Sequence, residues 1–471
     1  MATRRDQLQS YQFMTQRVIS AFVMRETDPA QSPLRRGVGA VFGGLMVAVL
    51  VAAGFGIYGL LTKIGSAKWK NEGAVVVEKE TGATYVYVGG VLHPTLNFAS
   101  AMLASGRPNP AVFPVSANSL DGVPRDTTIG IPGAPTSLPG VKKLAGMPWS
   151  VCAVPGTDAG GQPSNVIGLA VSSAPTGAVR MGDDGLLVTD GRGGLTYLVW
   201  HGQRYRVHDA KHIVPALFGA VTPVRVGTAW LDAMPAGSDI ENVQVDKRGE
   251  PSGSVPGRQI GDVLVAQTGS GPQSYLVFAD GLAPITPLQQ AILSIDKQVR
   301  PVEVTVGEVT SAPRSGRLRS PTGNAQPPTS PPKLVNPAPD APVCAVTSNA
   351  KDNPVVMVGG TVSGLDTAPR TPSSTSTGVS LADRVLVPAG RVAVVRGMGS
   401  PTAESGPYYV VTDLGIKYPV PSAAVLPLLG YAPDQATDVP VGLVSRIPSG
   451  PTLDPAEAIK PAPVTDARAG G

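Results

Sequence analysis

The sequence is poor in charge and in aromatic side chains. Charged residues make up 15% and aromatic residues 5% of its 471 positions, whereas about 25% of a typical globular domain is charged. This excludes a long coiled coil, a charge-rich disordered tail and a helix-rich enzyme. The net charge is only +4 and no basic stripe is evident, so we expect no nucleic-acid partner.

The motifs of several common enzyme classes are missing. No Gly-Lys dipeptide occurs, which excludes the usual Walker A phosphate loop. Gly-x-Ser-x-Gly and His-Glu-x-x-His are absent as well. We therefore expect no catalytic and no cofactor-binding residue.

Metal ligands are equally sparse. The two cysteines, Cys152 and Cys344, form no Cys-x-x-Cys pair, which argues against zinc and thioredoxin-type sites. His208 and His212 are four apart in an expected helix and could share a zinc ion, but an exposed helix face is the favoured interpretation. Asp183-Asp184 is interpreted as a turn at a strand entrance rather than a calcium site. No metal is expected.

Glycine and proline are abundant instead. The chain has 56 glycines and 48 prolines, about 22% of its residues, just short of the roughly 25–30% typical of low-complexity chains. Because 42% of the residues are apolar, real cores can form. The composition predicts a turn-rich, mostly β protein with loose connecting segments.

One long apolar run lies near the start. Residues 37–61 carry no charge, and at 1.5 Å per residue they span about 37 Å, enough for a hydrocarbon core of about 30 Å. The run is too long and begins too late for a signal peptide, so it predicts one transmembrane helix. Gly39 and Gly43 form a GxxxG pair that could pack against another membrane helix.

Flanking charge does not decide the orientation, since four basic residues lie within twenty positions on each side. About 410 residues follow the run, and long domains translocate largely regardless of flanking charge. They include both cysteines, whose disulfide would persist outside the cytoplasm. We expect a cytoplasmic N-terminus and an extracytoplasmic bulk.

Residues 1–36 contain an apolar stripe. Its members recur at three- and four-residue spacing, as on one face of a helix, and are Leu8, Tyr11, Met14, Val18 and Phe22. Asp28-Pro29 is expected to end this helix. A lone short helix cannot bury the stripe, so it needs a partner protein or a membrane surface, and we favour a partner.

Four later stretches resemble one another. Each has a tyrosine and, five or six residues on, a glycine: Tyr85/Gly90, Tyr197/Gly202, Tyr275/Gly281 and Tyr409/Gly415. Three residues beyond the glycine lie His93, Tyr205, Pro284 and Tyr418; the ring side chains among them are interpreted as core-edge residues rather than sugar contacts. The predicted module is strand, turn, strand, short helix and strand, the last strand starting at Pro114, Pro223, Pro301 or Pro440.

A second duplication surrounds the cysteines. Val-Cys-Ala-Val occurs at residues 151–154 and again at 343–346. Two pseudo-symmetric halves would make these segments neighbouring strands and bring Cys152 to Cys344; the alternative is pairing between chains. The proline-rich stretch 313–342 is expected to be an extended linker.

These patterns define an expected organisation. The segments are a cytoplasmic amphipathic helix (1–36), a transmembrane helix (37–61), repeat 1 (72–125), the first half of a central domain (140–180), repeat 2 (185–240), repeat 3 (258–312), the linker (313–342), the second half of the central domain (343–380), repeat 4 (383–450) and a proline-rich C-terminal tail (451–471).

Several of these features together resemble the EccB family, the B component of the type VII (ESX) secretion core complex of actinobacteria. They are the N-terminal RRDQLQSYQFMTQRVISA, the Asp28-Pro29 break, a single span after Arg35-Arg36, the block TGATYVYVGGVLHPTLNFASA and two widely spaced cysteines. The resemblance implies a single-pass inner-membrane protein with a cytoplasmic N-terminal helix. It also implies an elongated α+β, β-rich periplasmic region of four repeated small domains around a central disulfide-linked domain.

By the same resemblance, the chain is expected to be a structural subunit that scaffolds the export pore. The implied partners are EccC, EccD, EccE, a mycosin protease and other copies of its own ectodomain. The alternative is a cell-wall-binding ectodomain with peptidoglycan contact, or an ATP-hydrolysing one. ATP hydrolysis has been proposed for the family, and the missing Walker A motif counts against it here.

Overall fold

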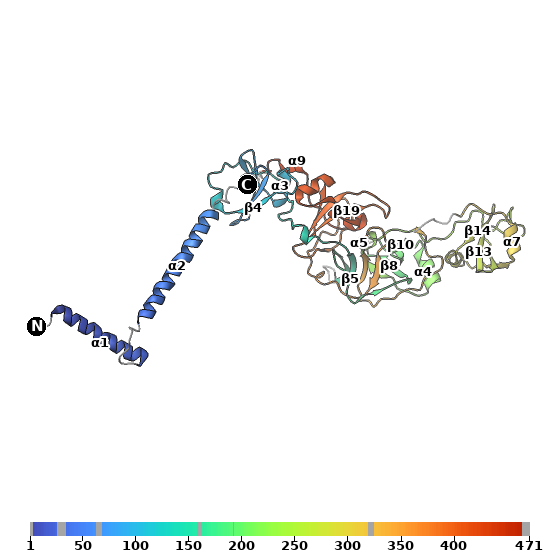
Figure 1. Cartoon of the computed structure of the whole chain (residues 1–471). Coiled ribbons are helices and arrows are strands. Elements are labelled where there is room, and N and C mark those ends of the chain that lie inside the picture. The colour runs from blue at the N-terminus through green and yellow to red at the C-terminus, as the bar shows by residue number, and fades with distance from the viewer. Residues whose placement is uncertain are drawn as a thin grey trace, which may run out of the picture. The chain divides into compact units, whose positions relative to one another are not determined.

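The computed structural model describes residues 3–25, 34–62, 68–157, 163–191, 193–318 and 325–463 (Figure 1). The chain separates into two units. The first comprises residues 1–71 and 115–121, and the second comprises residues 72–114 and 122–471.

The first unit contains two long helices and a short 3₁₀ turn, η2 (Ala117–Ser119). Helix α1 (Arg4–Met24) begins where the Asp6 carboxylate accepts hydrogen bonds from the backbone N–H and the hydroxyl of Thr3, at 2.9 and 2.7 Å. This contact satisfies a donor that the helix start leaves open. The helix ends at Arg25, which has a left-handed φ of 55°. The predicted stop at Asp28-Pro29 lies outside the described residues.

Helix α2 (Leu34–Thr62) contains the predicted membrane span. Residues 37–58 have a mean hydropathy of 2.3, and their large apolar side chains are exposed on every face of the helix. Such a helix is apolar all round, as a lipid-facing segment must be. The prediction of one membrane helix over 37–61 is confirmed as one long apolar helix.

The second unit contains four four-stranded sheets with one strand order: third, second, first, fourth in chain order. Within each sheet, the first strand pairs antiparallel with the second, and the second pairs antiparallel with the third. The fourth strand is parallel to the first in the second, third and fourth sheets. Their strands are β1 (Ala74–Glu78), β2 (Thr84–Val88), β3 (Val91–Thr95) and β4 (Val112–Val115); β8 (Leu186–Asp190), β9 (Thr196–Trp200), β10 (Gln203–Arg206) and β11 (Val224–Val226); β12 (Val263–Thr268), β13 (Gly271–Phe278), β14 (Gly281–Ile285) and β15 (Val302–Val304); and β19 (Val392–Met398), β20 (Tyr408–Thr412), β21 (Lys417–Val420) and β22 (Thr437–Pro440).

Helices connect and follow these strands at matching places. The connection from third to fourth strand carries α3 (Phe98–Ala104), α4 (Ala210–Phe218), α6 (Pro287–Leu293) or the 3₁₀ helix η5 (Ala423–Leu429). After the fourth strand of the second, third and fourth sheets come α5 (Thr228–Asp232), α7 (Val306–Ser311) and α8 (Val441–Val444).

The predicted module lacked the third strand. Pro94, Pro284 and Pro419 interrupt the apolar alternation there, but these strands lie at the sheet edge, where proline is tolerated. Two predicted starts of the last strand were also wrong. Strand β4 begins at Val112, before Pro114, and β22 ends rather than begins at Pro440.

The second unit also contains a six-stranded sheet, with the strand order β18-β6-β5-β16-β17-β7. Its strands are β5 (Trp149–Thr157), β6 (Pro163–Ala170), β7 (Val179–Arg180), β16 (Val343–Thr347), β17 (Val355–Val358) and β18 (Arg384–Leu386). The two Val-Cys-Ala-Val segments form the neighbouring antiparallel strands β5 and β16, with Cys152 opposite Cys344.

Three apolar cores join the sheets. One contains residues of the six-stranded sheet together with the second and fourth sheets, including the fully buried Trp149 and Trp230. Another is shared by the first and fourth sheets, and a third joins the second sheet and α4 to helix α6 of the third module. The second and fourth sheets therefore share a core with the central strands, whereas the first sheet shares its core with the fourth.

The segments outside the sheets also pack. Two residues of the expected linker, Lys333 and Val335, bind the backbone of Gly185 just before β8. Gly185 donates to the carbonyl of Lys333 and accepts from the N–H of Val335. The linker therefore pairs with the second sheet. The C-terminal segment through 463 carries α9 (Pro455–Ala458), which packs against α3. The remaining short helices are η3 (Val141–Lys143) and η6 (Pro433–Gln435).

Candidate functional site

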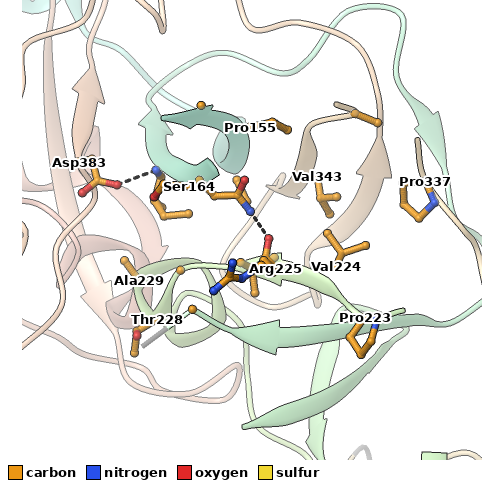
Figure 2. A pocket seen from close by; sticks show the side chains of 18 of the residues that line it. Pro155, Ser164, Pro223, Val224, Arg225, Thr228, Ala229, Pro337, Val343 and Asp383 are labelled. Atoms are coloured by element: carbon orange, nitrogen blue, oxygen red, sulfur yellow. Dashed lines mark hydrogen bonds between the residues drawn. The ribbon is translucent and has the colours of Figure 1, made fainter. Parts of the chain in front are cut away.

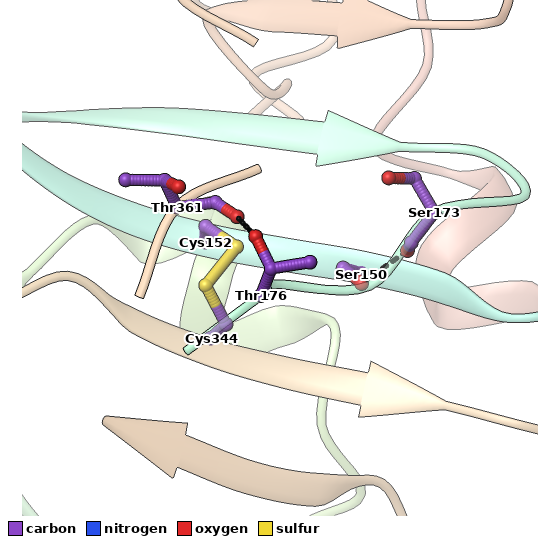
Figure 3. Close-up of a disulfide and its surroundings, with 6 residues drawn as sticks. All are labelled: Ser150, Cys152, Ser173, Thr176, Cys344 and Thr361. Atoms are coloured by element: carbon purple, nitrogen blue, oxygen red, sulfur yellow. Dashed lines mark hydrogen bonds between the residues drawn. A yellow bond between two sulfur atoms is a disulfide. The ribbon is translucent and has the colours of Figure 1, made fainter. Parts of the chain in front are cut away.

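The disulfide between Cys152 and Cys344 joins the two strands at the middle of the six-stranded sheet (Figure 3). The two Cα atoms are 4.0 Å apart, and both residues are at most 1% exposed. Leu365 packs beside the sulfurs. A Cβ on Gly168 would lie 2.6 Å from Leu365, so glycine on β6 lets Leu365 approach the sheet. The sequence-predicted pairing within one chain is the one present.

Hydrogen bonds hold the loops around this bond. The Ser150 hydroxyl donates to the Ser173 carbonyl at 2.6 Å, and the Thr176 hydroxyl donates to the Thr361 carbonyl at 3.3 Å (Figure 3). Thr176 and Thr361 also exchange two backbone hydrogen bonds of 2.9 and 3.0 Å. The covalent bond therefore lies inside a network that fixes both halves of the sheet.

A charged cluster lies where the second and fourth sheets meet. Arg446, whose side chain is 8% exposed, donates to Asp232 at 3.2 Å and to the carbonyl of Ser380 at 2.7 Å. Arg204 donates to the other oxygen of Asp232 at 2.8 Å. Because a buried charge is costly without partners, this geometry favours one relative placement of the two sheets.

Lys417 is next to this cluster. Its ammonium donates to the Val444 carbonyl at 2.8 Å. Burial, with the positive charge of Arg446 nearby, lowers the pKa of Lys417 to about 8. The position therefore tolerates a charged amine at a cost to stability.

A recurrent segment covers the exposed edge of each four-stranded sheet. It consists of an apolar residue followed by proline, at Pro124, Pro235, Pro313 and Pro448. Each proline carbonyl accepts a backbone hydrogen bond of 2.8–3.0 Å from one residue of the third strand, namely Leu92, Arg204, Leu282 or Lys417. We call these segments the proline clamps; they occupy edge groups that could otherwise pair with another chain.

The proline clamps also show which residues of the four modules are equivalent. The residues after the clamped positions are His93, Tyr205, Ala283 and Tyr418, so the predicted equivalence of Pro284 was wrong by one residue. Tyr205 and Tyr418 are 1% and 3% exposed, which places them in the cores and leaves no ring face for a sugar. Burial raises the pKa of Tyr205 to about 12.

The clamps explain two glycines that the sequence patterns did not single out. A Cβ on Gly237 would lie 2.2 Å from the Tyr205 ring, and one on Gly450 would lie 2.4 Å from the Tyr418 ring. In the second and fourth modules the tyrosine occupies the space that a side chain at the glycine would need.

A cavity of about 540 Å³ opens between the six-stranded sheet and the second sheet (Figure 2). Its wall comes from β6, from β11, and from residues 336–341 and 380–383. The amide of Asn165 donates to the carbonyl of Arg225, and Asp383 accepts from the backbone N–H of Ile167 at 2.8 Å. Sequence patterns missed this site because its wall comes from segments far apart in the chain.

The predicted stripe on α1 is exposed among the described residues. The exposed fractions are 61% for Leu8, 74% for Tyr11, 67% for Met14, 57% for Val18 and 87% for Phe22. At 100° per residue these five side chains lie within about 120° of one helix face, and Phe13 lies on the other. A Cβ at Gly39 or Gly43 would meet nothing within 4 Å, so this face of α2 is open to close approach.

The histidine pair of the sequence does not form one site. His208 precedes α4 rather than lying in it, and it contacts Asp239, while His212 contacts Asp209. Asp183 and Asp184 lie in a turn, where Asp183 contacts His201. In the described ranges no group of three or more His, Cys, Asp or Glu side chains is placed to hold a metal.

Comparison with known proteins gives consistent matches. The family model described as "Type VII secretion system ESX-1, transport TM domain B" matches residues 1–462. The chain is 29% identical over 447 residues to the ESX-2 secretion system ATPase EccB2 of Mycobacterium tuberculosis, covering 87% of this chain and 85% of the relative. It is also 29% identical over 489 residues to the ESX-3 secretion system ATPase EccB3 of Mycolicibacterium smegmatis, covering 97% and 90%.

Solved structures match as well. A chain of the EccB3 dimer from the ESX-3 core complex is 26% identical, with a TM-score of 0.61, covering 82% of this chain and 100% of that one. A chain of the intact ESX-5 inner membrane complex is 24% identical, with a TM-score of 0.63, covering 100% and 98%, and shows the same fold.

Proposed function

The chain belongs to the EccB family of type VII secretion proteins, and on this basis we propose that it is a structural, membrane-anchored subunit of an ESX inner-membrane core complex. The observation that carries the proposal is the combination of one long apolar helix with a large β-rich body held together by shared cores and a buried disulfide. Such a body presents fixed surfaces to other subunits, as a scaffold requires.

We infer that α1 is cytoplasmic and that the second unit lies in the periplasm. The long segment after α2 and the disulfide both support this orientation. Cysteine labelling of intact spheroplasts with a membrane-impermeant maleimide tests this orientation. A single cysteine introduced at the exposed Ser10 of α1 should react only after the cells are opened, and one at Ser270 should react in intact spheroplasts.

The second unit is best divided into four repeated domains around a central disulfide-linked domain. The common strand order and the proline clamps support this division. With the clamps included, we propose that repeat 1 extends to 129 and that repeat 3 includes residues 313–315, somewhat beyond the boundaries expected from sequence.

We propose EccC, EccD, EccE and a mycosin protease as components of the same complex, with other copies of this ectodomain. Within it, the exposed stripe of α1 is the candidate contact for another subunit on the cytoplasmic side. Its five apolar side chains expose surface that a soluble partner could bury.

Native gel electrophoresis of membranes solubilised in mild detergent tests the scaffold function. The tagged chain should migrate in a megadalton-scale assembly; migration only as a monomer or dimer would refute the proposal. The double variant Tyr11→Asp/Met14→Asp should release the chain from the assembly, because it puts two charges on the stripe. The matched control Phe13→Asp, on the opposite face of α1, should leave the assembly intact.

A second candidate is ATP hydrolysis, because the named relatives are called secretion ATPases. The sequence contains no Gly-Lys dipeptide, so any nucleotide site would differ from the usual phosphate loop. Phosphate release by the purified full-length chain, measured with and without ATP, separates the two functions. A scaffold gives no release above the no-protein control.

Peptidoglycan contact by the repeats is a further candidate partner interaction. Co-sedimentation of the full-length chain in detergent micelles with purified cell wall tests it. The buried tyrosines of the second and fourth units offer no ring to a sugar, so we do not favour this interaction.

A further inference from the structure

The cavity between the six-stranded and second sheets has the size of a ligand site. Its volume of about 540 Å³ lies within the roughly 300–1,000 Å³ of small-molecule pockets. A sphere of that volume is about 10 Å across, which equals the length of three extended residues at about 3.3 Å each. The cavity therefore has room for a short peptide.

The wall of the cavity is mixed in polarity and holds two charges. It contains no aromatic residue and is made mainly of glycine, proline, serine, threonine, asparagine and small aliphatic side chains. The charged residues in it are Arg225, on β11, and Asp383, just before β18. The wall therefore offers both polar and small apolar surface, as a peptide backbone with small side chains would need, and it offers no ring on which an aromatic ligand could stack.

Both charges are available for a ligand. Among the residues that the structure describes, no ion pair joins Arg225 to a carboxylate or Asp383 to a cation. Arg225 is exposed, and Asp383 is half-buried and uses one oxygen to accept from Ile167 (Figure 2). One wall thus offers an unpaired cation and another an unpaired carboxylate.

The backbone adds a donor beside Arg225. Gly191, just after β8, donates to the carbonyl of Val226 at 2.8 Å. The N–H and C=O of Val226 therefore point toward β8. In a strand, the peptide groups of the next residue face the other way. The carbonyl of Arg225 accordingly meets Asn165, and its N–H points to the same side, where the cavity lies.

From these features we propose that the cavity binds a short free peptide of about three residues. The terminal carboxylate of the peptide pairs with the Arg225 guanidinium, which offers two parallel donors, and accepts from the Arg225 N–H. Its terminal amino group pairs with Asp383. A free peptide carries both charges within this length, whereas the end of a long partner chain brings only one.

Isothermal titration of the full-length chain in nanodiscs, with trialanine as the probe, tests this proposal. Trialanine should bind, and N-acetyl-trialanine and trialanine amide should each bind about tenfold more weakly or worse, because each lacks one of the charges. Equal binding of trialanine and its N-acetyl form would overturn the pairing of the amino group with Asp383. No heat from trialanine at millimolar concentration would overturn the site.

Two variants locate the site. Arg225→Ala and Asp383→Asn should each weaken trialanine binding about tenfold, and Arg225→Lys should have an intermediate effect because it keeps the charge and loses the paired donors. Arg300→Ala, which removes an exposed arginine outside the cavity, is the control and should bind as the wild type does. Unchanged binding by both cavity variants would refute the assignment.

The proposal is independent of the scaffold function. Arg225→Ala and Asp383→Asn should still migrate in the large assembly on native gels, and their thermal unfolding should match that of Arg300→Ala. An Asp383→Asn protein that unfolds early would be replaced by Asp383→Glu, which keeps the charge and should retain at least partial binding if the carboxylate holds the amino group.

Discussion

Reducing the Cys152–Cys344 bond should lower the free energy of global unfolding by about 5 kcal/mol. The bond closes a loop with a sequence separation of 192 residues. In the chain-entropy description, such a loop removes about 18 cal/mol/K from the unfolded chain, which is about 5 kcal/mol at 25 °C. The native sheet should persist, because strands β5 and β16 keep five backbone register pairs without the sulfurs.

The measurement is hydrogen-exchange pulse labelling along a guanidinium chloride titration, with peptides from β5 and β16 as the readout. Oxidised and reduced wild type are compared first, because reduction leaves both sulfur atoms in place and isolates the effect of the cross-link. The double variant Cys152→Ala/Cys344→Ala should lose a further increment, since removing two buried sulfurs leaves a cavity.

A result would refute this reasoning if reduction changed the unfolding free energy of β5 and β16 by less than about 1 kcal/mol. That result would mean that the second and third sheets stay folded when the central strands separate, so that the loop is already closed without the bond. Peptides from β1 and β2, which lie outside the loop, report whether the first sheet unfolds together with the central strands.

Two further changes test the packing of the fourth module. Gly450→Ala should lower the free energy of unfolding by about 1–3 kcal/mol because its Cβ would overlap the Tyr418 ring; thermal unfolding measures this, and Gly316→Ala, which meets open space, should change it by less than about 0.5 kcal/mol. An equal loss in both variants would contradict the packing explanation. Lys417 has a pKa of about 8 in the folded chain against 10.5 for the ordinary group, so the unfolded chain binds more protons between these pH values and stability rises with pH there. Relative to Lys417→Met, the wild type should gain about 2 kcal/mol between pH 8 and pH 10.5 in denaturant titrations, and a constant difference would show that the amine is not buried as a charge.

The sequence predicts features that depend on neighbouring residues. The apolar run of α2, the face of α1 and the tyrosine strands β2, β9, β13 and β20 all follow from local periodicity. The central pairing of β5 with β16 follows from the duplicated Val-Cys-Ala-Val, because a repeated segment with one cysteine per copy restricts the register.

Other features depend on contacts that periodicity does not record. The third strands contain proline at an edge position, where a missing N–H breaks no bond to the neighbouring strand, so they resembled turns. The proline clamps leave a pattern in the sequence, an apolar residue followed by proline after each module. Only their hydrogen bonds to the third strands show which residues of the four modules are equivalent. Arg225 and Asp383 share a cavity only because β11 and the segment before β18 both approach β6.

The shared core of the first and fourth sheets has a consequence for biosynthesis. The core around Val75 and α3 is completed by Leu426, Leu453 and Ala458, which the ribosome adds more than 320 residues after Ala104. Since chains fold from the N-terminus as they are made, the earliest domain to emerge must wait, incompletely packed, for the last. Nascent chains truncated before residue 420 should therefore leave α3 open to protease, even though every residue of the first sheet is already present.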